Sequence, residues 1–502
     1  MNSYSHAALV LVGHGSTMNP DSSAPTHRHA DEIRSRGLFR EVVCCFWKEE
    51  PTMREVEEAV DSEVVYIVPN FISEGYFCQQ VLPRELRLDG PVTRRDGKTF
   101  YYCDPVGIHP NMTRLLLQRA DEVAPGVPRS ETSLIIVGHG TNLNDNSTKA
   151  IQDQVRLIRE GGHGFAEVMD AYMEEAPLVS DWPTMTTAKN VVVVPFFIAD
   201  GLHSFQDIPV LLGMEKEPGK AQSEMDVFRH NPIPLHGRNL YFSNAIGTEP
   251  LMAEVILDQV HDFDAKHGIA TATAVSGQAG ATLRDALAGW LNQGRDTLGQ
   301  VRIVPDGSGF ELRHVADAGA VAEDLALHEG TTAARDIARC DAEGAFRPIK
   351  TASTLKRGWR LKLAGLDDLL LALEFFYPAA VGMARAQEAG SLSPVPLRSL
   401  LGRQTGMYRF ANGITDEQAG EMVGSFCTRE SKCMRRIVWP LDTGKPLPET
   451  ARAKVGEAAG LEPGIQPGRC VPLLCMEACN HIVSVARKLA RENNEAKAKV
   501  HA

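Results

Sequence analysis

The stretch LVGHGSTMN (residues 11–19) returns, with small changes, as IVGHGTNLN (residues 136–144). Two further pairs of blocks repeat in the same order and at nearly the same spacing: FWKEEP (46–51) with YMEEAP (172–177), and VPNFISEGYFCQQVLP (68–83) with VPFFIADGLHSFQDIP (194–209). Three blocks in one order at one spacing indicate a duplicated domain of about 125 residues, a size typical of a single domain.

Each copy opens with an apolar run, AALVLVG (7–13) in the first and SLIIVG (133–138) in the second. Further runs rich in β-branched residues alternate with stretches of helical pattern. This alternation predicts parallel sheets buried on both faces and wrapped by helices. The repeated blocks fall where the predicted strands end, and the carboxyl ends of strands are where open α/β sheets bind ligands.

The length of 502 residues predicts roughly three or four domains. The second half of the chain changes character, because Asp306-Gly307 between alternating apolar positions predicts a β-hairpin and a helical, cysteine-rich region follows. We therefore expect two tandem flavodoxin-like α/β domains, a small α+β domain and a mainly helical domain. Their expected bounds are 1–126, 127–262, 263–370 and 371–502.

The formal net charge of −12 gives no general attraction to nucleic acid or to anionic membranes. The first apolar run leads directly into the repeated motif, so we expect it to be a strand and not a signal peptide. Other apolar runs are too short to span a bilayer. These features favour a cytoplasmic protein that binds neither nucleic acid nor membrane.

Histidines mark both copies of the first block. Glycines on either side of His14 and of His139 permit a tight turn after the strand, so a purely structural role is one interpretation. The second copy adds His203 after another predicted strand, whereas the first copy has Phe77 at that position. Imidazole binds Fe, Co, Ni and Zn and also accepts protons near neutral pH. His139 and His203 are therefore candidates for one metal site.

The motifs VGHGS/T, a glutamate before proline at a strand end, and VPxFxxxGxHxxxxDIP resemble those of class II sirohydrochlorin chelatases. The resemblance covers residues 1 to about 260. It implies two flavodoxin-like halves that face each other across a cleft. It also implies ATP-independent insertion of Co(II) or Fe(II) into a sirohydrochlorin-type tetrapyrrole, in cobalamin or sirohaem biosynthesis.

By this resemblance the two metal-handling histidines are His139 and His203, and the assisting glutamate is Glu174 or Glu175. Glu175 is favoured because it has a counterpart, Glu49, at the same offset in the first copy. His14 is a third candidate for metal contact, with a structural or substrate-contact role as the alternative.

Insertion requires the metal to lose water and the macrocycle to lose two pyrrole protons. Two histidines can hold a divalent ion loosely enough to release it, and a carboxylate can take protons. Backbone N–H groups at helix N-termini could bind the carboxylates of the tetrapyrrole. A second hypothesis is a non-catalytic tetrapyrrole or metal carrier, in which an iron–sulfur domain in the cysteine-rich C-terminal region, described next, senses redox state or iron.

Five of the ten cysteines lie near the C-terminus: Cys427, Cys433, Cys470, Cys475 and Cys479. Four thiolates can hold a [4Fe–4S] cluster or a structural zinc, and inert thiols are the third possibility; the CxxC knuckles usual in zinc ribbons are absent from the sequence. The spacing is similar to that of sirohaem-dependent reductases and of an iron–sulfur domain fused to some chelatase-like proteins. By these comparisons the ligands are Cys427, Cys433, Cys475 and Cys479, which leaves Cys470 unassigned.

Overall fold

The computed structural model describes residues 4–16, 19–140, 146–216, 228, 230–269, 282–340, 355–389, 395–404, 406–426, 472–473 and 478–500. The chain forms two compact units. The first unit comprises Met1–Trp47 and Ser62–Ser276, and the second comprises Lys48–Asp61 and Gly277–Ala502.

The first repeat contains a five-stranded sheet in the order β2-β1-β3-β5-β4, in which only β4 is antiparallel to its neighbour. Its elements are β1 (Tyr4–Gly13), α1 (Ala24–Ser35), β2 (Phe39–Phe46), β3 (Val64–Pro69), α2 (Leu82–Glu85), β4 (Val92–Arg95), β5 (Lys98–Tyr102) and α3 (Met112–Val123). The apolar run that opens the sequence repeat is thus the buried strand β1 at the middle of the sheet.

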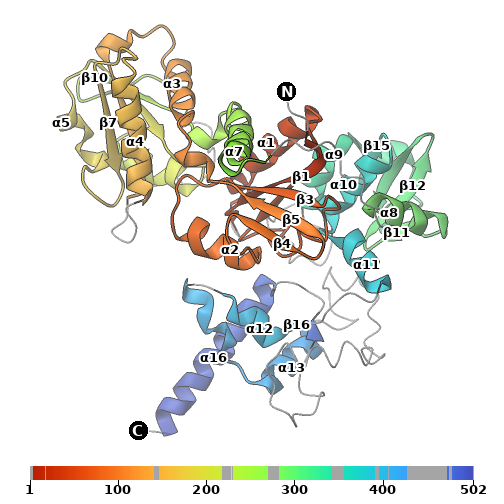
Figure 1. Cartoon of the computed structure of the whole chain (residues 1–502). Helices are drawn as coiled ribbons and strands as arrows, with labels where there is room; N and C mark the ends of the chain where they lie inside the picture. The colour runs from red at the N-terminus through yellow and green to blue at the C-terminus, as the bar shows by residue number, and fades with distance from the viewer. Residues whose placement is uncertain are drawn as a thin grey trace. The chain divides into compact units, whose positions relative to one another are not determined.

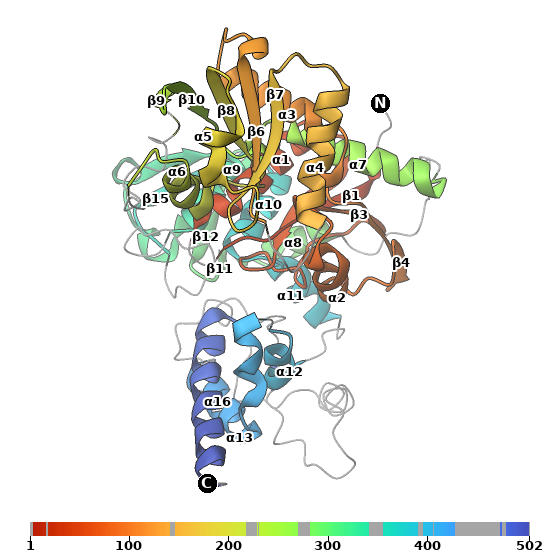
Figure 2. The same ribbon diagram turned by 90° about the vertical axis from the view of Figure 1, so that its left-hand side faces the viewer.

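The second repeat has a sheet of the same topology, β7-β6-β8-β10-β9, again with one antiparallel edge strand (Figure 2). Its elements are β6 (Thr132–Gly138), α4 (Asn146–Glu160), β7 (Glu167–Tyr172), α5 (Trp182–Met185), β8 (Asn190–Pro195), α6 (Ile208–Leu211), β9 (Ile233–Leu235), β10 (Arg238–Phe242) and α7 (Met252–His267). The prediction of two tandem, mainly parallel α/β sheets is confirmed.

Both faces of the second sheet are buried, because neighbouring residues of a strand point to opposite faces. Leu134 and Ile136 of β6 pack in the cluster that contains the apolar side of α4. Ile135 and Val137 pack in a second cluster with Trp182 of α5 and with α6. The continuous apolar runs of the sequence therefore follow from burial on both sides of each strand.

The last helix of each repeat packs against the other repeat. Helix α3 follows the first sheet but contacts β8 and α4, whereas α7 follows the second sheet but contacts β3 and α1 (Figure 1). Asp264 of α7 accepts hydrogen bonds from Tyr4 of β1 at 2.9 Å and from Tyr66 of β3 at 2.7 Å. This exchange of helices makes the two repeats one compact unit.

A glycine lies at the start of each exchanged connection. A Cβ atom on Gly107 would come within 2.0 Å of the backbone oxygen of Ile72, and one on Gly247 within 2.1 Å of the backbone oxygen of Ile198. Real Cβ atoms do not approach a backbone atom so closely. Both connections therefore require glycine, and the two repeats are alike in this respect.

The second unit contains the small α+β domain, whose mixed sheet has the order β11-β12-β13-β15-β14. Its elements are α8 (Leu283–Asn292), β11 (Thr297–Leu298), β12 (Val301–Asp306), β13 (Gly309–His314), β14 (Ala326–Glu329), α9 (Gly330–Ala338), β15 (Trp359–Leu363), α10 (Leu366–Phe376) and α11 (Ala380–Glu388). Asp306 pairs with Gly309 across the turn, which confirms the predicted hairpin.

A segment of the first sequence repeat, residues 48–61, belongs to this second unit. Asp61 accepts hydrogen bonds from Arg385 of α11 and from the backbone N–H of Leu283, both at 2.6 Å. A Cβ atom on Gly382 would lie 1.8 Å from the backbone oxygen of Glu58, so α11 and the segment are in close backbone contact. The segment is thus held by the small domain.

The described C-terminal region is mainly helical (Figure 2). Its elements are β16 (Val395–Pro396), α12 (Leu397–Gly402), the 3₁₀ helix η11 (Gly406–Gly413), α13 (Asp416–Phe426), β17 (Pro472–Leu473) and α16 (Asn480–Val500). Leu400 and Leu401 of α12 pack with Ile482 and Ala486 of α16 in a separate apolar core.

Within the ranges given above, no single helix is long and apolar enough to span a membrane. Only a bent pair, Leu366–Phe376 with Ala380–Ala386, reaches the required length and composition, and its two helices meet at 94°.

Candidate metal-insertion site

His139 directly follows the last residue of β6, at the carboxyl edge of the second sheet. The chain turns sharply here because Gly140 has φ 74°, in the left-handed region that favours glycine. A Cβ atom on Gly140 would also lie 2.7 Å from Cγ of Glu175 and 2.9 Å from Cβ of Tyr172. The glycine after the histidine therefore allows the loop after β7 to approach the histidine.

Backbone hydrogen bonds hold that loop against His139. The carbonyl oxygen of His139 accepts from the N–H groups of Met173, at 3.1 Å, and Glu174, at 3.0 Å. The ring atom Nδ1 of His139 lies 2.8 Å from the carbonyl oxygen of Gly140 and 3.7 Å from a carboxylate oxygen of Glu174. Because both neighbours of Nδ1 are acceptors, this nitrogen carries the ring proton.

His203 begins a single π turn, His203–Asp207, at the end of the loop that follows β8. Such turns are rare and are frequent at functional sites. Nδ1 of His203 lies 2.7 Å from a carboxylate oxygen of Asp207, and its ring lies beside that of Phe197 with centroids 5.9 Å apart. The ring is held on one side by a charge-assisted hydrogen bond and on another by an aromatic side chain.

The structure brings His139 and His203 together, although they are 64 residues apart in the sequence. Their ring centroids are 5.0 Å apart and their planes meet at 80°. In each ring the acceptor at Nδ1 selects the tautomer that leaves the lone pair of Nε2 for a metal ion. Their side chains are 40% and 46% exposed, so an ion from solution can reach them.

The two candidate glutamates differ in their contacts. Glu175 accepts a short hydrogen bond from the hydroxyl of Thr148, in the first turn of α4. Glu174 lies nearer the Nδ1 atom of His139 and is 62% exposed. Both carboxylates therefore lie near the turn at His139 and Gly140.

The loop that carries His203 is anchored by Asp200. Its buried carboxylate accepts hydrogen bonds from the backbone N–H of Ala245 at 2.7 Å and from the side chain of Asn244 at 2.9 Å. Burial raises the pKa of Asp200 above its ordinary value, and the two hydrogen bonds oppose this shift. The anchor fixes the loop to the end of β10, beside the histidine pair.

Loops of the first repeat contact the loops of this site. Asn146, at the start of α4, donates a hydrogen bond at 2.7 Å to the backbone oxygen of Glu74 in the first repeat. Asn19 of the first repeat likewise lies close to the loop that carries His203: its side-chain nitrogen would be 3.9 Å from a Cβ atom on Gly201. The two carboxyl sheet edges therefore face each other, as the resemblance implies for a fused pair.

His14 has the same local geometry as His139 but a different neighbour. Its Nδ1 atom lies 2.8 Å from the carbonyl oxygen of Gly15, as Nδ1 of His139 does from Gly140. Its ring contacts Phe77, with centroids 5.0 Å apart, where His139 contacts His203. At the position of His203, the first repeat therefore places the phenyl ring of Phe77 beside its histidine.

Among the described residues, no group of three or more His, Cys, Asp or Glu side chains has the arrangement of a metal site. Four of the C-terminal cysteines, Cys427, Cys433, Cys470 and Cys475, lie outside those residues. Cys479 is described: it is partly buried, directly precedes α16 and packs against the apolar core of the helical region. A thiolate at a helix N-terminus is stabilised by the helix dipole, so Cys479 fits the role of a cluster ligand.

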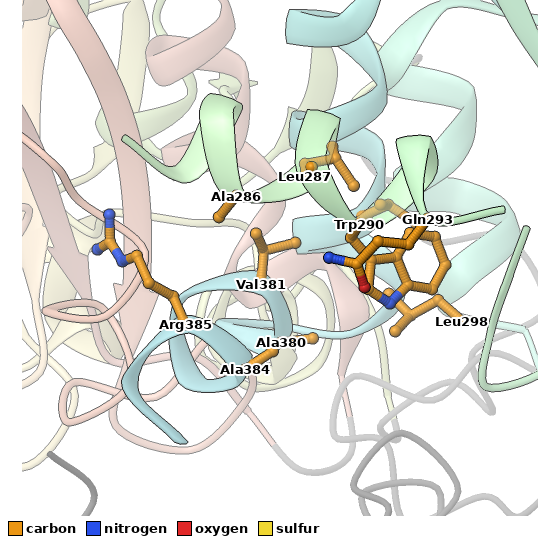
Figure 3. Close-up of a pocket in the computed structure, with 11 residues that line it drawn as sticks. Ala286, Leu287, Trp290, Gln293, Leu298, Ala380, Val381, Ala384 and Arg385 are labelled. Carbon is orange, nitrogen blue, oxygen red and sulfur yellow. The ribbon is translucent and has the colours of Figure 1, made fainter. Parts of the chain in front are cut away.

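A cavity of about 170 Å³ lies in the small domain, between α8 and α11 (Figure 3). Its wall is mainly apolar and includes Trp290, Leu298 and Val381. Of its lining residues only Arg385 is ionisable, and its guanidinium binds Asp61 at 2.6 Å. This wall offers no metal ligand or proton acceptor, and the histidine pair is the better candidate site.

The fold and the paired histidines define a chelatase-type protein built from two repeats. A family model described as CbiX matches residues 8–123 and 133–263, and two further models, a DR2241 stabilising domain and a 4Fe-4S iron-sulfur cluster binding domain, match residues 283–388 and 389–488. A probable sirohydrochlorin cobaltochelatase of Halobacterium salinarum is 42% identical over 279 residues, which are 52% of this chain and 93% of the relative. The chain belongs to the CbiX family.

Two more proteins are similar to this chain, one over about a quarter of its length and the other over nearly all of it. A sirohydrochlorin cobaltochelatase of Methanopyrus kandleri is 26% identical over 141 residues, or 26% of this chain and 95% of that protein. The crystal structure of DR2241 from Deinococcus radiodurans, a multi-domain protein with structural similarity to chelatases and two additional domains, superposes with a TM-score of 0.73. That match has 28% identity and covers 97% of this chain and 99% of DR2241.

The repeated motifs indicate the two histidines, but not the groups that hold their rings. Asp207 was visible only as part of the block DIP, and its spacing of four residues from His203 was the available signal. Asp200 gave no signal, since its partners Ala245 and Asn244 are about 45 residues away.

Proposed function

We propose that this protein is a sirohydrochlorin metal chelatase that inserts Co(II), or Fe(II), into the tetrapyrrole without ATP, in cobalamin or sirohaem biosynthesis. The observation that carries the proposal is the edge-to-face pair His139/His203, in which an acceptor at each Nδ1 directs Nε2 to an ion. The names of the relatives support cobalt and sirohydrochlorin as substrates. The proposal includes a cytoplasmic location, where the thiols of the cysteine-rich segment stay reduced.

In this proposal the two imidazoles hold the divalent ion while it exchanges water for pyrrole nitrogens. Two neutral ligands bind an ion more weakly than a closed four-ligand site, which allows its release to the macrocycle. The two pyrrole protons leave one after the other: Glu175, or its neighbour Glu174, accepts each proton in turn and releases it to water. His14 is proposed to contact the substrate from the facing repeat.

The test is to incubate the purified protein, without oxygen, with sirohydrochlorin and Co²⁺, Fe²⁺ or Ni²⁺ and to follow the change in the tetrapyrrole spectrum. We expect insertion by the wild type and loss of most of it in His139→Ala and in His203→Ala. His163→Ala, beyond the opposite end of α4, is the matched control and should retain the wild-type rate. Wild-type rates in both site variants, with the fold intact, would refute this site.

The same experiment addresses the second hypothesis. A protein that binds both tetrapyrrole and metal but accelerates no insertion is a carrier and not a chelatase. Difference spectra at equilibrium would show binding, and the time course would show the missing catalysis.

For the C-terminal region we propose a [4Fe–4S] cluster held by Cys427, Cys433, Cys475 and Cys479. Such a cluster, when bound, supplies a one-electron redox centre. Iron content and a visible absorbance that bleaches with dithionite should be present in protein purified without oxygen. Cys479→Ser should lose both, and Cys470→Ser, the matched control, should keep both.

A further inference from the structure

Asp207 is the last residue of the π turn that begins with His203. Its carboxylate oxygen lies 2.7 Å from Nδ1 of His203, while the two side chains are 43% and 46% exposed. An ionised carboxylate only accepts hydrogen bonds, so the contact requires a proton on Nδ1. Within the described part of the chain, Asp207 is the side chain that sets the tautomer of His203.

The carboxylate is well placed to do this because its own backbone is fixed. The next residue, Ile208, is fully buried in the apolar core beneath the second sheet. The N–H of Ile208 also donates to the carbonyl oxygen of His203, which closes the π turn. The backbone positions of Asp207 and His203 are therefore fixed by the π turn, unlike those of two unconnected surface residues.

The first repeat has the same π turn, Phe77–Val81, at the corresponding place. There the histidine is replaced by Phe77 and the aspartate by the buried Val81. Phe197 next to His203 has its counterpart in Phe71, whose ring is 5.9 Å from that of Phe77. The scaffold around the histidine is kept in both copies, whereas the histidine and its carboxylate are present together or absent together.

We propose that Asp207 is a positioning residue for metal binding by His203: it holds the ring and keeps the proton on Nδ1, so that Nε2 presents its lone pair to a divalent ion. This inference rests on the proposed function for its role in insertion, but the effect on the ring and on metal binding is independent of the tetrapyrrole. Carboxylate partners of metal-binding histidines contribute about 10–100-fold to metal affinity.

The first test reads the tautomer directly. Long-range ¹H–¹⁵N correlation spectra of protein labelled at histidine distinguish protonated from bare ring nitrogens, and His203→Phe identifies the signals of His203. We expect the Nδ1–H form in the wild type. Asp207→Asn keeps the size of the side chain, but its amide can also donate to Nδ1, so the Nε2–H form should become populated. Asp207→Glu, which retains the carboxylate, should restore the wild-type form.

The second test measures binding of Co²⁺ alone by titration of the full chain. Asp207→Asn should weaken binding about 10–100-fold while the melting temperature is unchanged. The same is expected of Asp207→Val, which introduces the residue that the first repeat has at this position. Asp207→Glu should recover most of the affinity. The control is Asp181→Asn, an exposed carboxylate elsewhere in the same repeat.

Unchanged tautomer and unchanged Co²⁺ affinity in both Asp207→Asn and Asp207→Val would overturn the proposal. Weaker binding with an unchanged tautomer would also overturn it, because the effect would then be one of charge alone. Failure of the wild type to insert metal into sirohydrochlorin would refute the proposed function, but the spectra and the titration would still decide whether Asp207 positions His203.

Discussion

The two repeats share one backbone and differ in what their side chains do. In both, a glycine with positive φ follows the histidine at the end of the first strand, and a π turn follows the third strand. Three counterpart pairs then differ in role: His203 and Phe77, Asp207 and Val81, Glu175 and Glu49. A duplicated scaffold can therefore keep its turns while its two copies place different side chains on them.

The glutamates show the difference most clearly. Glu175 bonds to Thr148 on the helix of its own repeat, close to His139. Glu49 instead lies in the second unit, where its fully buried carboxylate binds Arg339 at 2.7 Å. Arg339, just after α9, is also mostly buried. In the first repeat, the glutamate at this position therefore stabilises the small domain through its ion pair with Arg339.

The largest effect is expected from breaking that ion pair. Arg339→Met should destabilise the second unit by about 3–5 kcal/mol, because it removes the cation beside a buried carboxylate. Calorimetric unfolding of the full chain measures the change. Glu175→Gln, the counterpart in the second repeat, should leave the melting temperature nearly unchanged and lower the rate of insertion.

The double variant Glu49→Gln/Arg339→Met provides the control for this prediction. It removes both charges and should recover much of the lost stability. An Arg339→Met protein as stable as the wild type would show that the buried pair contributes little.

Exchanging residues between the copies should have the next largest effect. His203→Phe, which gives the second repeat the residue of the first, should reduce the rate of insertion by about 100-fold or more, or about 2.7 kcal/mol of activation free energy. The reciprocal Phe77→His should bind Co²⁺ in the first repeat about 10–100-fold more weakly than the native pair does in the second, since Val81 supplies no carboxylate. Insertion rates and Co²⁺ titration measure the two variants. A second Co²⁺ bound by Phe77→His as tightly as the first would contradict the comparison.

Substitution of the glycines that start the connections to α3 and α7 tests a feature that the two repeats share. Gly107→Ala and Gly247→Ala should each destabilise the first unit by at least about 1–3 kcal/mol, since the added Cβ meets a backbone oxygen that cannot move away easily. Gly289→Ala, where the added atom meets open space, is the control. A large effect in only one repeat would show that the exchange is not symmetric; chemical denaturation provides the measurement.

The smallest effect on stability at neutral pH is expected at His29 and its counterpart Gln154, each of which contacts the backbone of the other repeat. His29 of α1 contacts the backbone oxygen of Gly247 at 2.8 Å, and Gln154 of α4 reaches that of His109 at 3.3 Å. Burial lowers the pKa of His29 to about 4 from 6.5. Between pH 6.5 and 4 the imidazole of His29 is protonated more readily in the unfolded chain than in the folded protein. The contribution of neutral, buried His29 to the free energy of unfolding is therefore fully present above pH 6.5 and is lost as the pH falls toward 4.

His29→Gln makes the first repeat resemble the second and should remove this acid sensitivity. The loss in the wild type should be at most about 1.4 kcal/mol for each pH unit. Urea unfolding at pH 7 and at pH 5 would test it, and an identical pH dependence in the variant would assign the effect to other groups.

Much of the architecture followed from local patterns in the sequence. The repeated blocks and the continuous apolar runs predicted two parallel sheets, and Asp306-Gly307 predicted a hairpin, because strand burial and turn chemistry are properties of neighbouring residues. The approach of His139 and His203 was also expected, since parallel strands end at one edge of a sheet.

Contacts between distant residues were decided only by the tertiary structure. The exchange of α3 and α7 leaves no local signal, because an amphipathic helix packs equally well on either of two similar sheets. Glu49 and Arg339 are 290 residues apart, and only the fold brings the buried charges together. The sequence by itself determined which residue types stand at the strand ends. The tertiary structure decided which of them meet, because a buried charge or a ring tautomer depends on the partners that packing places beside it.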